Sequence, residues 1–407
     1  METKTVKTEK MVFGGNTIAK INSKAVFIPY TMPDETLSIN IVQQKNDYDL
    51  AEIVKILEPS EHRVTPPCEY YGICGGCNMM HIDTEYQHEI RKNMLIDIFK
   101  KNNIDISDKV EIISGPDFGY RSRFQFRDGG LSEKSGNTII PIKKCLCADD
   151  SINEYLEKTP LEQRPKGRIH FFGTSKIDGT DKVRFETPAA QENKSPKLKG
   201  KSAKKIKPKE NHYFAGTILS QDNFVTVELN GKKVSFDVRG FFQSNLNVFE
   251  KVLSLINSTL PEGKNILDMY AGCGSISTFL ADKYENVVLV EHNRDALVFA
   301  EMNMQNKKHV SYGLSGENWV KNCASLCGKF DACVVDPPRS GIEAAVANYL
   351  CKSKIPFIRS LSCDPTTHAR DAQKLIAAGY KLEKIYLLDF YPHTSHIESL
   401  AIFNLEI

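Results

Sequence analysis

Two features that often reveal a partner are missing from this sequence. The 407 residues carry a formal net charge of only +2, so overall charge makes no case for nucleic-acid binding and only local patches can. No apolar run approaches the roughly 20 residues of a membrane-spanning helix, and residues 1–10 lack the apolar core of a secretion signal. We therefore expect a cytoplasmic protein without a membrane partner, whose 11 cysteines are thiols or ligands rather than disulfides. No obligate protein partner is inferred.

A third glycine is missing from the turn Gly272-Cys273-Gly274, which lies between a strand pattern and a helix pattern. Dinucleotide sites usually carry G-x-G-x-x-G, so the shorter pattern favours a single adenosine unit such as that of S-adenosylmethionine. The next apolar run ends in Glu291, an acid placed to bind a ribose diol. The order of strands and helices over residues 248–407 predicts an α/β fold with a doubly wound, mostly parallel sheet.

One cysteine has a distinctive setting. Cys363 follows the apolar run 355–358, and Pro365 precedes a helix-like run that begins near Thr366. This strand–turn–helix order places the thiol at the open end of a sheet, beside a helix N-terminus whose partial positive charge can lower a thiol pKa. Cys363 is therefore a candidate nucleophile, although a lone cysteine is more often a small buried residue.

Three other cysteines, Cys68, Cys74 and Cys77, follow the spacing C-x5-C-x2-C with glycines among them. A four-thiolate site needs one more ligand, and Cys145 and Cys147 are the candidates. Zinc and an iron–sulfur cluster are both compatible with four thiolates. The spacing predicts a metal or cluster site and leaves that choice open.

The remaining patterns divide the chain into three parts. Strand-like runs at 25–28, 38–42 and 50–57 predict a small β-barrel over residues 1–60, with residues 1–10 as a frayed start. Residues 61–247 are expected to form a β-rich central domain, and residues 248–407 the α/β domain.

The central part contains one helix pattern and one unusual stretch. An amphipathic helix is predicted over 84–101, with Thr84 as its N-cap. Asp178-Gly179 and Asn230-Gly231 are hairpin turn signals. About residues 190–210 lies a lysine-rich insertion, with eight lysines between 194 and 209, which is either a solvated linker or a phosphate-contacting arm.

Four motifs, taken together and in this order, resemble those of the RNA uracil-5-methyltransferases. They are Asp-Met-Tyr-Ala-Gly-Cys-Gly at 268–274, Asp-Pro-Pro-Arg at 336–339, Ser-Cys-Asp-Pro-Thr-Thr at 362–367 and Pro-His-Thr-Ser-His-Ile-Glu at 392–398. The resemblance covers nearly the whole chain and thins over 150–210. It departs from the family at Asp364, where Asn is usual, and at 275–276, where many members have Asn-Phe.

The resemblance implies a Rossmann-like methyltransferase domain that transfers a methyl group from S-adenosylmethionine to C5 of uracil. It implies that the Cys363 thiolate adds to C6 of the ring and that Glu398 removes the C5 proton. Burial beside the apolar run 400–403 is expected to raise the pKa of Glu398, and His393 or His396 is the alternative base. Five residues match the family's cofactor-contacting positions: Gln243, Tyr270, Ser275, Glu291 and Asp336.

The cysteine spacing, with Cys145 as the fourth ligand, resembles the iron–sulfur site of the family's 23S ribosomal RNA branch, which implies a [4Fe–4S] cluster on Cys68, Cys74, Cys77 and Cys145. Residues 1–57 resemble a TRAM domain, a small OB-like barrel that binds RNA. The implied partner is 23S ribosomal RNA, with a target uridine in a single-stranded loop or flipped out of its stack. Two alternatives stay open: methylation of transfer RNA, and a non-catalytic RNA-binding protein that keeps the fold.

Overall fold

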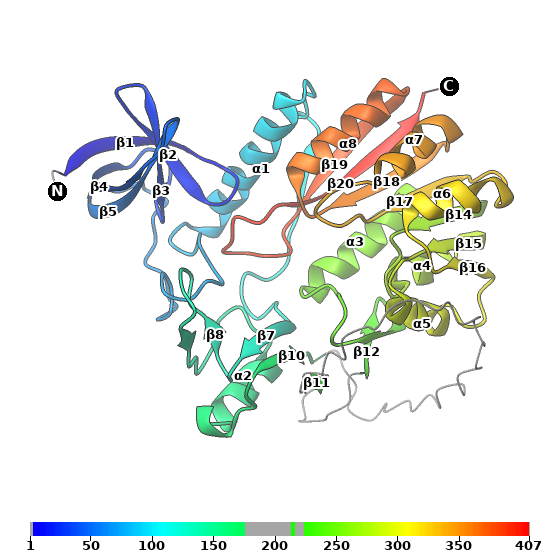
Figure 1. Cartoon of the computed structure of the whole chain (residues 1–407), viewed down its shortest axis with the longest axis horizontal. Helices are drawn as coiled ribbons and strands as arrows, with labels where there is room; N and C mark the ends of the chain where they lie inside the picture. Colours follow the sequence, from blue (N-terminus) through cyan, green and yellow to red (C-terminus); the bar gives the residue numbers. More distant parts are fainter. Residues whose placement is uncertain (1–2, 176–212, 216–223, 407) are drawn as a thin grey trace, which may run out of the picture.

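The computed structural model describes residues 3–175, 213–215 and 224–406. A small barrel lies at one end of the molecule and a large sheet with its helices at the other, with a smaller β-rich unit beside them (Figure 1). The lysine-rich insertion and the expected turn at 178–179 lie outside the described residues. In the part of the chain that the structure describes, every helix is too short or too polar to cross a membrane.

The first part is a closed barrel with the strand order β1-β2-β3-β5-β4. Its strands are β1 (Lys4–Met11), β2 (Asn16–Ile21), β3 (Lys24–Pro29), β4 (Thr36–Gln44) and β5 (Tyr48–Glu58). The barrel is confirmed, but the frayed start is wrong, because β1 pairs with both β2 and β4 and closes the barrel. The sequence of β1 is mostly polar and so does not look like a strand. Only alternate residues of a barrel strand, here Val6 and Thr8, point into the barrel.

The second part is an eight-stranded sheet in the order β16-β15-β14-β17-β18-β20-β19-β6. Its strands are β6 (Val110–Ile113), β14 (Gly263–Met269), β15 (Tyr284–Val290), β16 (His309–Tyr312), β17 (Ala332–Val335), β18 (Phe357–Ser362), β19 (Tyr380–Leu388) and β20 (Glu398–Leu405). The strands from β16 to β18 are parallel, and β20 runs antiparallel between β18 and β19. The predicted α/β class is confirmed, and β6 joins the sheet from the stretch 61–247.

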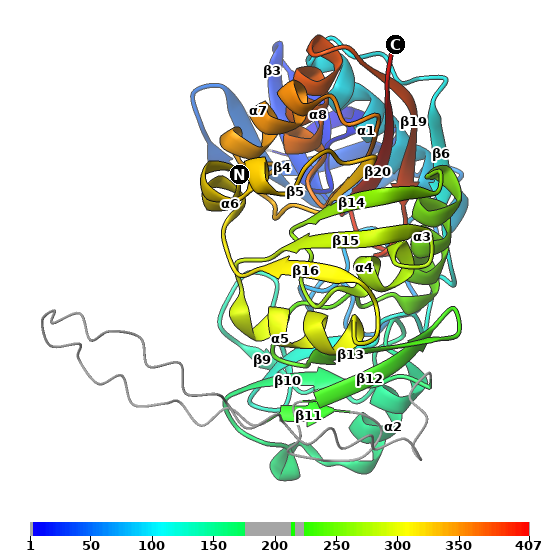
Figure 2. The same ribbon diagram turned by 90° about the vertical axis from the view of Figure 1, so that its right-hand side faces the viewer.

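Helices cover both faces of this sheet (Figure 2). On one face lie α1 (Thr84–Lys101), α6 (Gly316–Asn322), α7 (Ala344–Ser353) and α8 (Pro365–Ala377); on the other lie α3 (Leu246–Thr259), α4 (Ser275–Leu280) and α5 (Arg294–Asn303). Successive side chains of a strand point to opposite faces of the sheet. Cys333 and Val335 of β17 therefore pack in the core beneath α1, α6, α7 and α8, and Val334 packs in the core beneath α3, α4 and α5. Helix α1 has its predicted bounds, but its N-cap is Asp83, which accepts a hydrogen bond from the Tyr86 N–H.

The third part is the β-rich unit. It contains β7 (Arg123–Arg127), β8 (Leu131–Ser132), β9 (Ile139–Ile140), α2 (Asp150–Lys158), β10 (Arg168–Phe172), β11 (Tyr213–Ala215), β12 (Phe224–Leu229) and β13 (Lys232–Asp237). Phe124 and Phe126 of β7 pack in a core with Leu156 of α2. The hairpin of β12 and β13 turns at Asn230-Gly231 as predicted, with positive φ at both residues.

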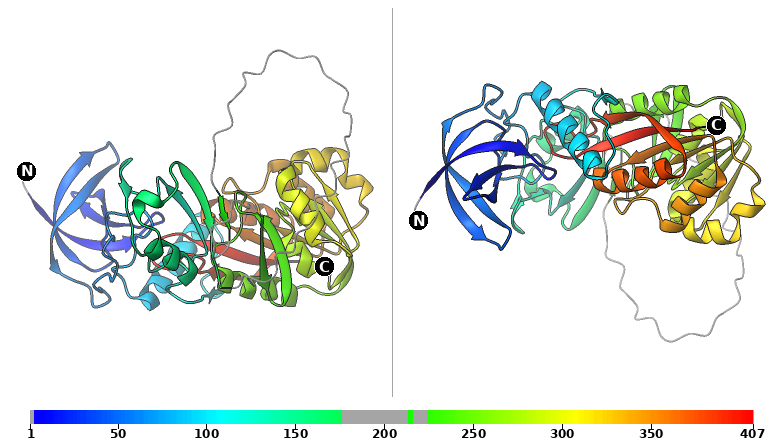
Figure 3. Two further views of the ribbon diagram at one scale, coloured as in Figure 1. Left: turned by 90° about the horizontal axis from the view of Figure 1, so that it is seen from below. Right: turned by 90° about the horizontal axis from the view of Figure 1, so that it is seen from above.

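The loop that connects β19 to β20, residues 389–397, extends from the sheet toward the barrel (Figures 1 and 3). Its first residue, Asp389, accepts two hydrogen bonds from the Arg91 guanidinium of α1, at 2.5 and 2.9 Å, and both side chains are only 1% exposed. His88 Nε2 lies 2.6 Å from the same carboxylate. Burial alone raises the pKa of Asp389, but the hydrogen bond with His88 and the charge of Arg91 bring it below its ordinary value. The loop is thus fixed to α1 at its start.

We predict that Arg91→Met lowers the free energy of unfolding by about 3 kcal/mol, because it removes the guanidinium that pairs with a buried carboxylate and leaves His88 as the remaining side-chain partner. Urea denaturation monitored by circular dichroism measures this change. Arg127→Met is the matched control, since Arg127 pairs with Asp128 at the surface and an exposed pair contributes about 1 kcal/mol or less. Equal losses in the two variants would contradict a special role for the Arg91–Asp389 pair.

Candidate active site

Three sequence-predicted residues come together at one edge of the large sheet. The pairing of β18 with β20 ends at Ser362 and Ser399, so Cys363 and Glu398 occupy the next facing positions, where Cα atoms lie about 5 Å apart. Asp336 follows the last residue of β17, which is parallel to β18. The nucleophile candidate and two carboxylates therefore share the carboxyl end of the parallel strands, where ligands bind in open α/β sheets.

The local sequence explains why Cys363 is held at this edge. Asp364 is the N-cap of α8 and accepts hydrogen bonds from the N–H groups of Thr366 and Thr367, at 2.9 and 3.0 Å. Pro365 is the first helical residue, a position where its missing N–H costs nothing. Asp and Asn cap helices about equally well, so the departure from the family at Asp364 preserves the turn.

Burial raises the pKa of the Cys363 thiol to about 11, and the charges of Glu398 and Asp336 raise it further than Arg339 lowers it. In the protein alone, desolvation and the two nearby carboxylates therefore set the direction of this pKa shift. Arg339, at the end of the Asp-Pro-Pro-Arg motif, is a residue that the sequence analysis did not assign. Its position three residues after Asp336 was the available signal.

The predicted tuning of Glu398 is confirmed in direction. Burial raises the pKa of this half-buried carboxyl group to about 8, with a further contribution from Asp336 and an opposing one from Arg339. Burial also raises the pKa of Asp336 to about 6. A carboxyl group with a pKa close to neutral pH can exchange a proton with a substrate in either direction.

The two histidines weighed as alternative bases differ in their surroundings. His393 is buried; its Nδ1 lies 3.1 Å from Gln87 Nε2, and its ring stacks on Phe118. His396 is exposed. Burial lowers the pKa of His393. The contacts of His393 indicate that it fixes the loop.

The glycine turn after β14 approaches Glu291 as the motif predicts. Gly272 N–H donates to Glu291 Oε2 at 3.0 Å, and Asn293 N–H donates to Oε1 at 2.6 Å. Tyr270, Gly272 and Gly274 have positive φ, and a Cβ on Gly272 would meet no atom within 4 Å. The backbone thus leaves open space beside the acid, as an adenosine-containing ligand requires.

Two buried polar atoms bear on a cofactor site because they have no hydrogen-bond partner among the described residues: Gln243 Oε1, and Oδ1 of Asp268, which comes just before the turn. The other oxygen of Asp268 accepts a hydrogen bond from Ser277, and burial raises the pKa of Asp268 to about 7. Unpaired buried polar atoms are costly unless a ligand completes them. Asp268 belongs to the glycine-turn motif, and an acid at the end of the strand before the turn is the sequence signal that marks it as a candidate.

The remaining cofactor candidates have different surroundings. The Tyr270 hydroxyl accepts a hydrogen bond from the Glu343 N–H at 3.1 Å, which ties it to the start of α7. Ser275 is the first residue of α4 and is half-buried. Their predicted contacts with a cofactor stay predictions.

The five cysteines of the expected metal site gather beside the β-rich unit. Cys77 Sγ lies 3.8 Å from Cys147 Sγ, and a contact with Cys147 together with burial raises the pKa of Cys145. Burial raises the pKa of Cys68 and Cys74, and the proximity of Cys145 raises it further. Among the described residues, no three His, Cys, Asp or Glu side chains are arranged closely enough to hold one metal ion. The ligand set Cys68, Cys74, Cys77 and Cys145 stays a prediction.

Comparison with known proteins gives consistent matches along the chain. Family models match residues 324–405 (tRNA (Uracil-5-)-methyltransferase) and 248–353 (Methyltransferase small domain). An "Uncharacterized RNA methyltransferase" of Treponema denticola is 38% identical, over 99% of this chain and 100% of its own length. The "23S rRNA (uracil(1939)-C(5))-methyltransferase RlmD" of Aliivibrio fischeri is 29% identical, over 98% of this chain and 95% of its own.

One solved structure has the same fold over almost the full length. The tRNA (uracil-54, C5)-methyltransferase of Pyrococcus abyssi, solved in complex with S-adenosyl-L-homocysteine, matches with a TM-score of 0.67 and 19% identity. The match covers 98% of this chain and 100% of that chain.

We predict that Glu398→Gln raises the melting temperature at pH 8 by roughly 1–4 °C. The folded-state pKa of about 8 lies above the ordinary value of 4.5, so the folded state binds the extra proton between these values. Stability therefore falls as pH rises from 4.5 to 8, and the glutamine removes this loss. Melting curves at pH 5.5 and 8 test it, with the exposed Glu262→Gln as control. A difference from wild type that does not grow with pH would refute the assignment.

Proposed function

The chain belongs to the RNA uracil-5-methyltransferase family, and we propose that it methylates C5 of a uridine in 23S ribosomal RNA through a covalent enzyme–RNA intermediate. Its activity is S-adenosylmethionine-dependent methylation of uracil in RNA. The proposal of a covalent mechanism depends on one observation. Cys363, just after the end of β18, and Glu398, at the start of β20, occupy facing positions.

The reaction needs both residues because C5 of uracil is a weak nucleophile. Addition of the Cys363 thiolate to C6 forms a C–S bond and moves electrons onto the ring carbonyl, which makes C5 nucleophilic. C5 then takes the methyl group and holds it together with its original proton. Glu398 removes that proton, the ring double bond re-forms, and the C–S bond breaks to release the thiolate.

S-Adenosylmethionine supplies the electrophilic methyl group on its sulfonium. We propose that Glu291 binds the ribose, that the free amide oxygen of Gln243 contacts the methionine end, and that Tyr270, Ser275 and Asp336 complete the site. The open space at Gly272 and the unpaired Gln243 oxygen support this placement. Asp268 is a further candidate, since its unpaired carboxylate oxygen lies beside the same turn.

The prediction for Cys363 and Glu398 separates their roles. With labelled S-adenosylmethionine and unmodified 23S ribosomal RNA, Cys363→Ala should reduce methyl transfer to background. Glu398→Gln should slow turnover about 10²- to 10⁴-fold and accumulate an enzyme–RNA adduct that survives denaturing electrophoresis, because the methylated ring cannot lose its proton. Glu262→Gln is the control with normal turnover. Adduct formation by Cys363→Ala, or fast turnover by Glu398→Gln, would refute the mechanism.

The choice of RNA rests on the names of the relatives and on the cysteine spacing. Several relatives at 27–29% identity are named for uracil methylation of 23S ribosomal RNA, whereas the structural neighbour is named for transfer RNA. Parallel assays on the two unmodified RNAs decide between them. Methylation of transfer RNA alone would keep the chemistry and overturn the substrate, and a chain that binds RNA and cofactor without transferring methyl would favour the non-catalytic alternative.

We also propose a [4Fe–4S] cluster on Cys68, Cys74, Cys77 and Cys145. Four thiolates are a donor set that such clusters and zinc accept, and zinc is the alternative. The case for Cys145 over Cys147 rests on its fixed backbone: Asn153 accepts from the Cys145 N–H at 2.9 Å and donates to its carbonyl oxygen at 3.0 Å. The cluster supplies no redox step that methyl transfer needs, so we propose a role in folding or RNA docking.

We predict that protein purified without oxygen is coloured, and that Cys145→Ser loses both the broad visible absorption and the bound iron. Cys147→Ser is the matched control two residues away and should keep both. If Cys147→Ser loses the visible absorption and the iron while Cys145→Ser keeps both, Cys147 is the fourth ligand instead of Cys145. If the purified protein is colourless and contains zinc, the site binds zinc and not a cluster.

The three-part division into 1–60, 61–247 and 248–407 is likewise proposed. The barrel and the β-rich unit each have a core of their own, whereas the hairpin of β12 and β13 packs in a core shared with the last part. Helix α1 and strand β6, from the middle part, pack with the last one. A cytoplasmic location follows from a ribosomal RNA substrate.

A further inference from the structure

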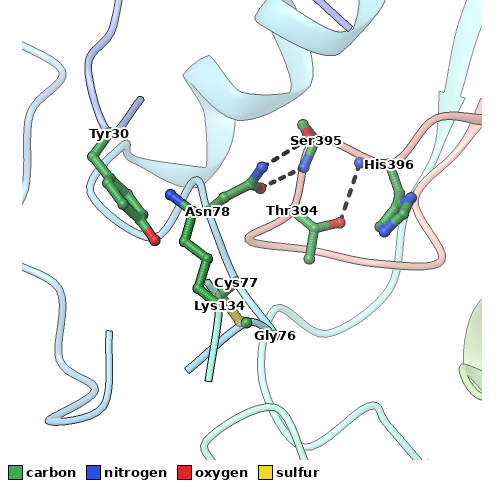
Figure 4. Close-up of a pocket in the computed structure, with 9 residues that line it drawn as sticks. Tyr30, Gly76, Cys77, Asn78, Lys134, Thr394, Ser395 and His396 are labelled. Carbon is green, nitrogen blue, oxygen red and sulfur yellow. Dashed lines mark hydrogen bonds between the residues drawn. The ribbon is translucent and has the colours of Figure 1, made fainter. Parts of the chain in front are cut away.

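A cavity of about 120 Å³ lies where four separate segments of the chain meet. These are the barrel, the cysteine loop (residues 68–77) with its neighbour Asn78, the turn after β8, and the β19–β20 loop. Figure 4 shows Tyr30, Lys134, Asn78, Ser395 and His396 around it. Because one water molecule occupies about 30 Å³ of liquid, the cavity has room for a larger group.

The wall of this cavity is rigid on one side. Asn78 Nδ2 donates to Ser395 Oγ at 2.9 Å, and the Ser395 N–H donates to Asn78 Oδ1 at 2.9 Å. Asn78 Nδ2 also lies 3.3 Å from the Gly14 carbonyl oxygen. These bonds join the cysteine loop to both the barrel and the β19–β20 loop, so the cavity has a fixed shape.

The opposite side offers hydrogen-bond donors and a positive charge. Lys134 is exposed, its Nζ lies 3.8 Å from the centre of the Tyr30 ring, and it has no ion-pair partner among the described residues. The Tyr30 hydroxyl oxygen is buried and has no hydrogen-bond partner there either. No carboxylate lines the cavity within the described ranges. This combination favours a small anion with several acceptor oxygens.

The cavity is close to the proposed reaction centre. His396 in its wall precedes Glu398 by two residues, which span at most about 7 Å of chain. A strand of RNA that places a flipped uracil between Cys363 and Glu398 therefore passes this wall within roughly one nucleotide. Lys134 reaches the wall because the residues after β8 pair with the cysteine loop, where the Lys134 N–H donates to the Ile73 carbonyl oxygen at 3.0 Å.

We propose that this cavity binds a backbone phosphate of the RNA strand next to the target uridine, with Lys134 as its counter-ion and the Tyr30 hydroxyl as a hydrogen-bond donor. The inference rests on the proposed function and adds to it a binding site outside the reacting groups. Phosphate contacts fix the register of a strand without reading its sequence, so the site positions the uridine for Cys363.

The test compares three variants of the proposed site, and one control variant, on unmodified 23S ribosomal RNA. Lys134→Met should raise the Kd for RNA about three- to tenfold and reduce the slope of log K against log salt by about 0.7–0.9, the value for one phosphate contact. Tyr30→Phe should raise Kd about two- to tenfold with little change in slope. Lys134→Arg should retain most of the affinity and the full slope. Turnover at saturating RNA should stay within about twofold of wild type in all of them.

The matched control is Lys321→Met, an exposed lysine on α6 at the opposite end of the molecule from the barrel (Figures 1 and 3). Melting temperatures of all variants exclude unfolding as the cause. A salt slope for Lys134→Met equal to that of Lys321→Met would overturn the proposal. So would saturable binding of inorganic phosphate that depends on Lys134 while RNA affinity does not, because the site would then take a free anion.

These outcomes are separable from the proposed function. If wild type transfers no methyl group to either RNA, the function fails whatever Lys134 does. If wild type is active and the Lys134→Met slope is unchanged, only the phosphate site fails. A change in turnover without a change in Kd would place Lys134 in positioning the catalytic residues and would also overturn the site.

Discussion

The antiparallel pairing of β18 with β20 is the constraint on which the candidate site depends. It alone brings Cys363, at the end of one strand, opposite Glu398, at the start of the other. A slip of one residue would turn every side chain of β20 to the other face of the sheet. The register is held by packing on both faces: Leu361 and Leu400, which pair across the strands, lie in one core, and Phe403 lies in the other. The geometry of the site is therefore a consequence of how the sheet buries its apolar residues.

The same edge concentrates negative charge that folding alone would avoid. Burial raises the pKa of Glu398, Asp336 and Asp268 to about 8, 6 and 7, so each group opposes folding as it ionises. Arg339 offsets this only in part, since it lowers the pKa of Glu398 without cancelling the effect of burial. Perturbed carboxyl groups gathered in one place are typical of catalytic sites. The cost in stability is consistent with an edge selected for proton transfer rather than for packing.

How much of this was predictable depends on the range of the interactions. Local patterns were sufficient for α1, whose apolar spacing gave both ends, and for the strand–turn–helix around Cys363. They failed where tertiary context decides: residues 4–11 look frayed until β1 closes the barrel, and the pKa of the Cys363 thiol follows from its burial and from carboxylates on other strands. The proximity of Cys147 to Cys77 and the cavity beside Lys134 join segments far apart in the chain, and no local spacing encodes such contacts.

The cysteine loop explains why thiol ligands would be useful on an enzyme without a redox step. This loop is part of a longer connection, residues 59–83, which joins β5 to α1 and contains no helix or sheet strand, and ordered connections of this length in compact proteins are usually functional. On one side the N–H groups of Asn78 and Met79 donate to the His393 carbonyl oxygen, at 3.1 and 3.0 Å. On the other side His81 Nε2 lies 3.2 Å from the Thr31 carbonyl oxygen of the barrel. A cross-link among the cysteines would restrict the unfolded chain and hold this loop in one conformation. Because this connection touches both the barrel and the segment that leads to Glu398, its rigidity would set the distance between the barrel and the candidate active site.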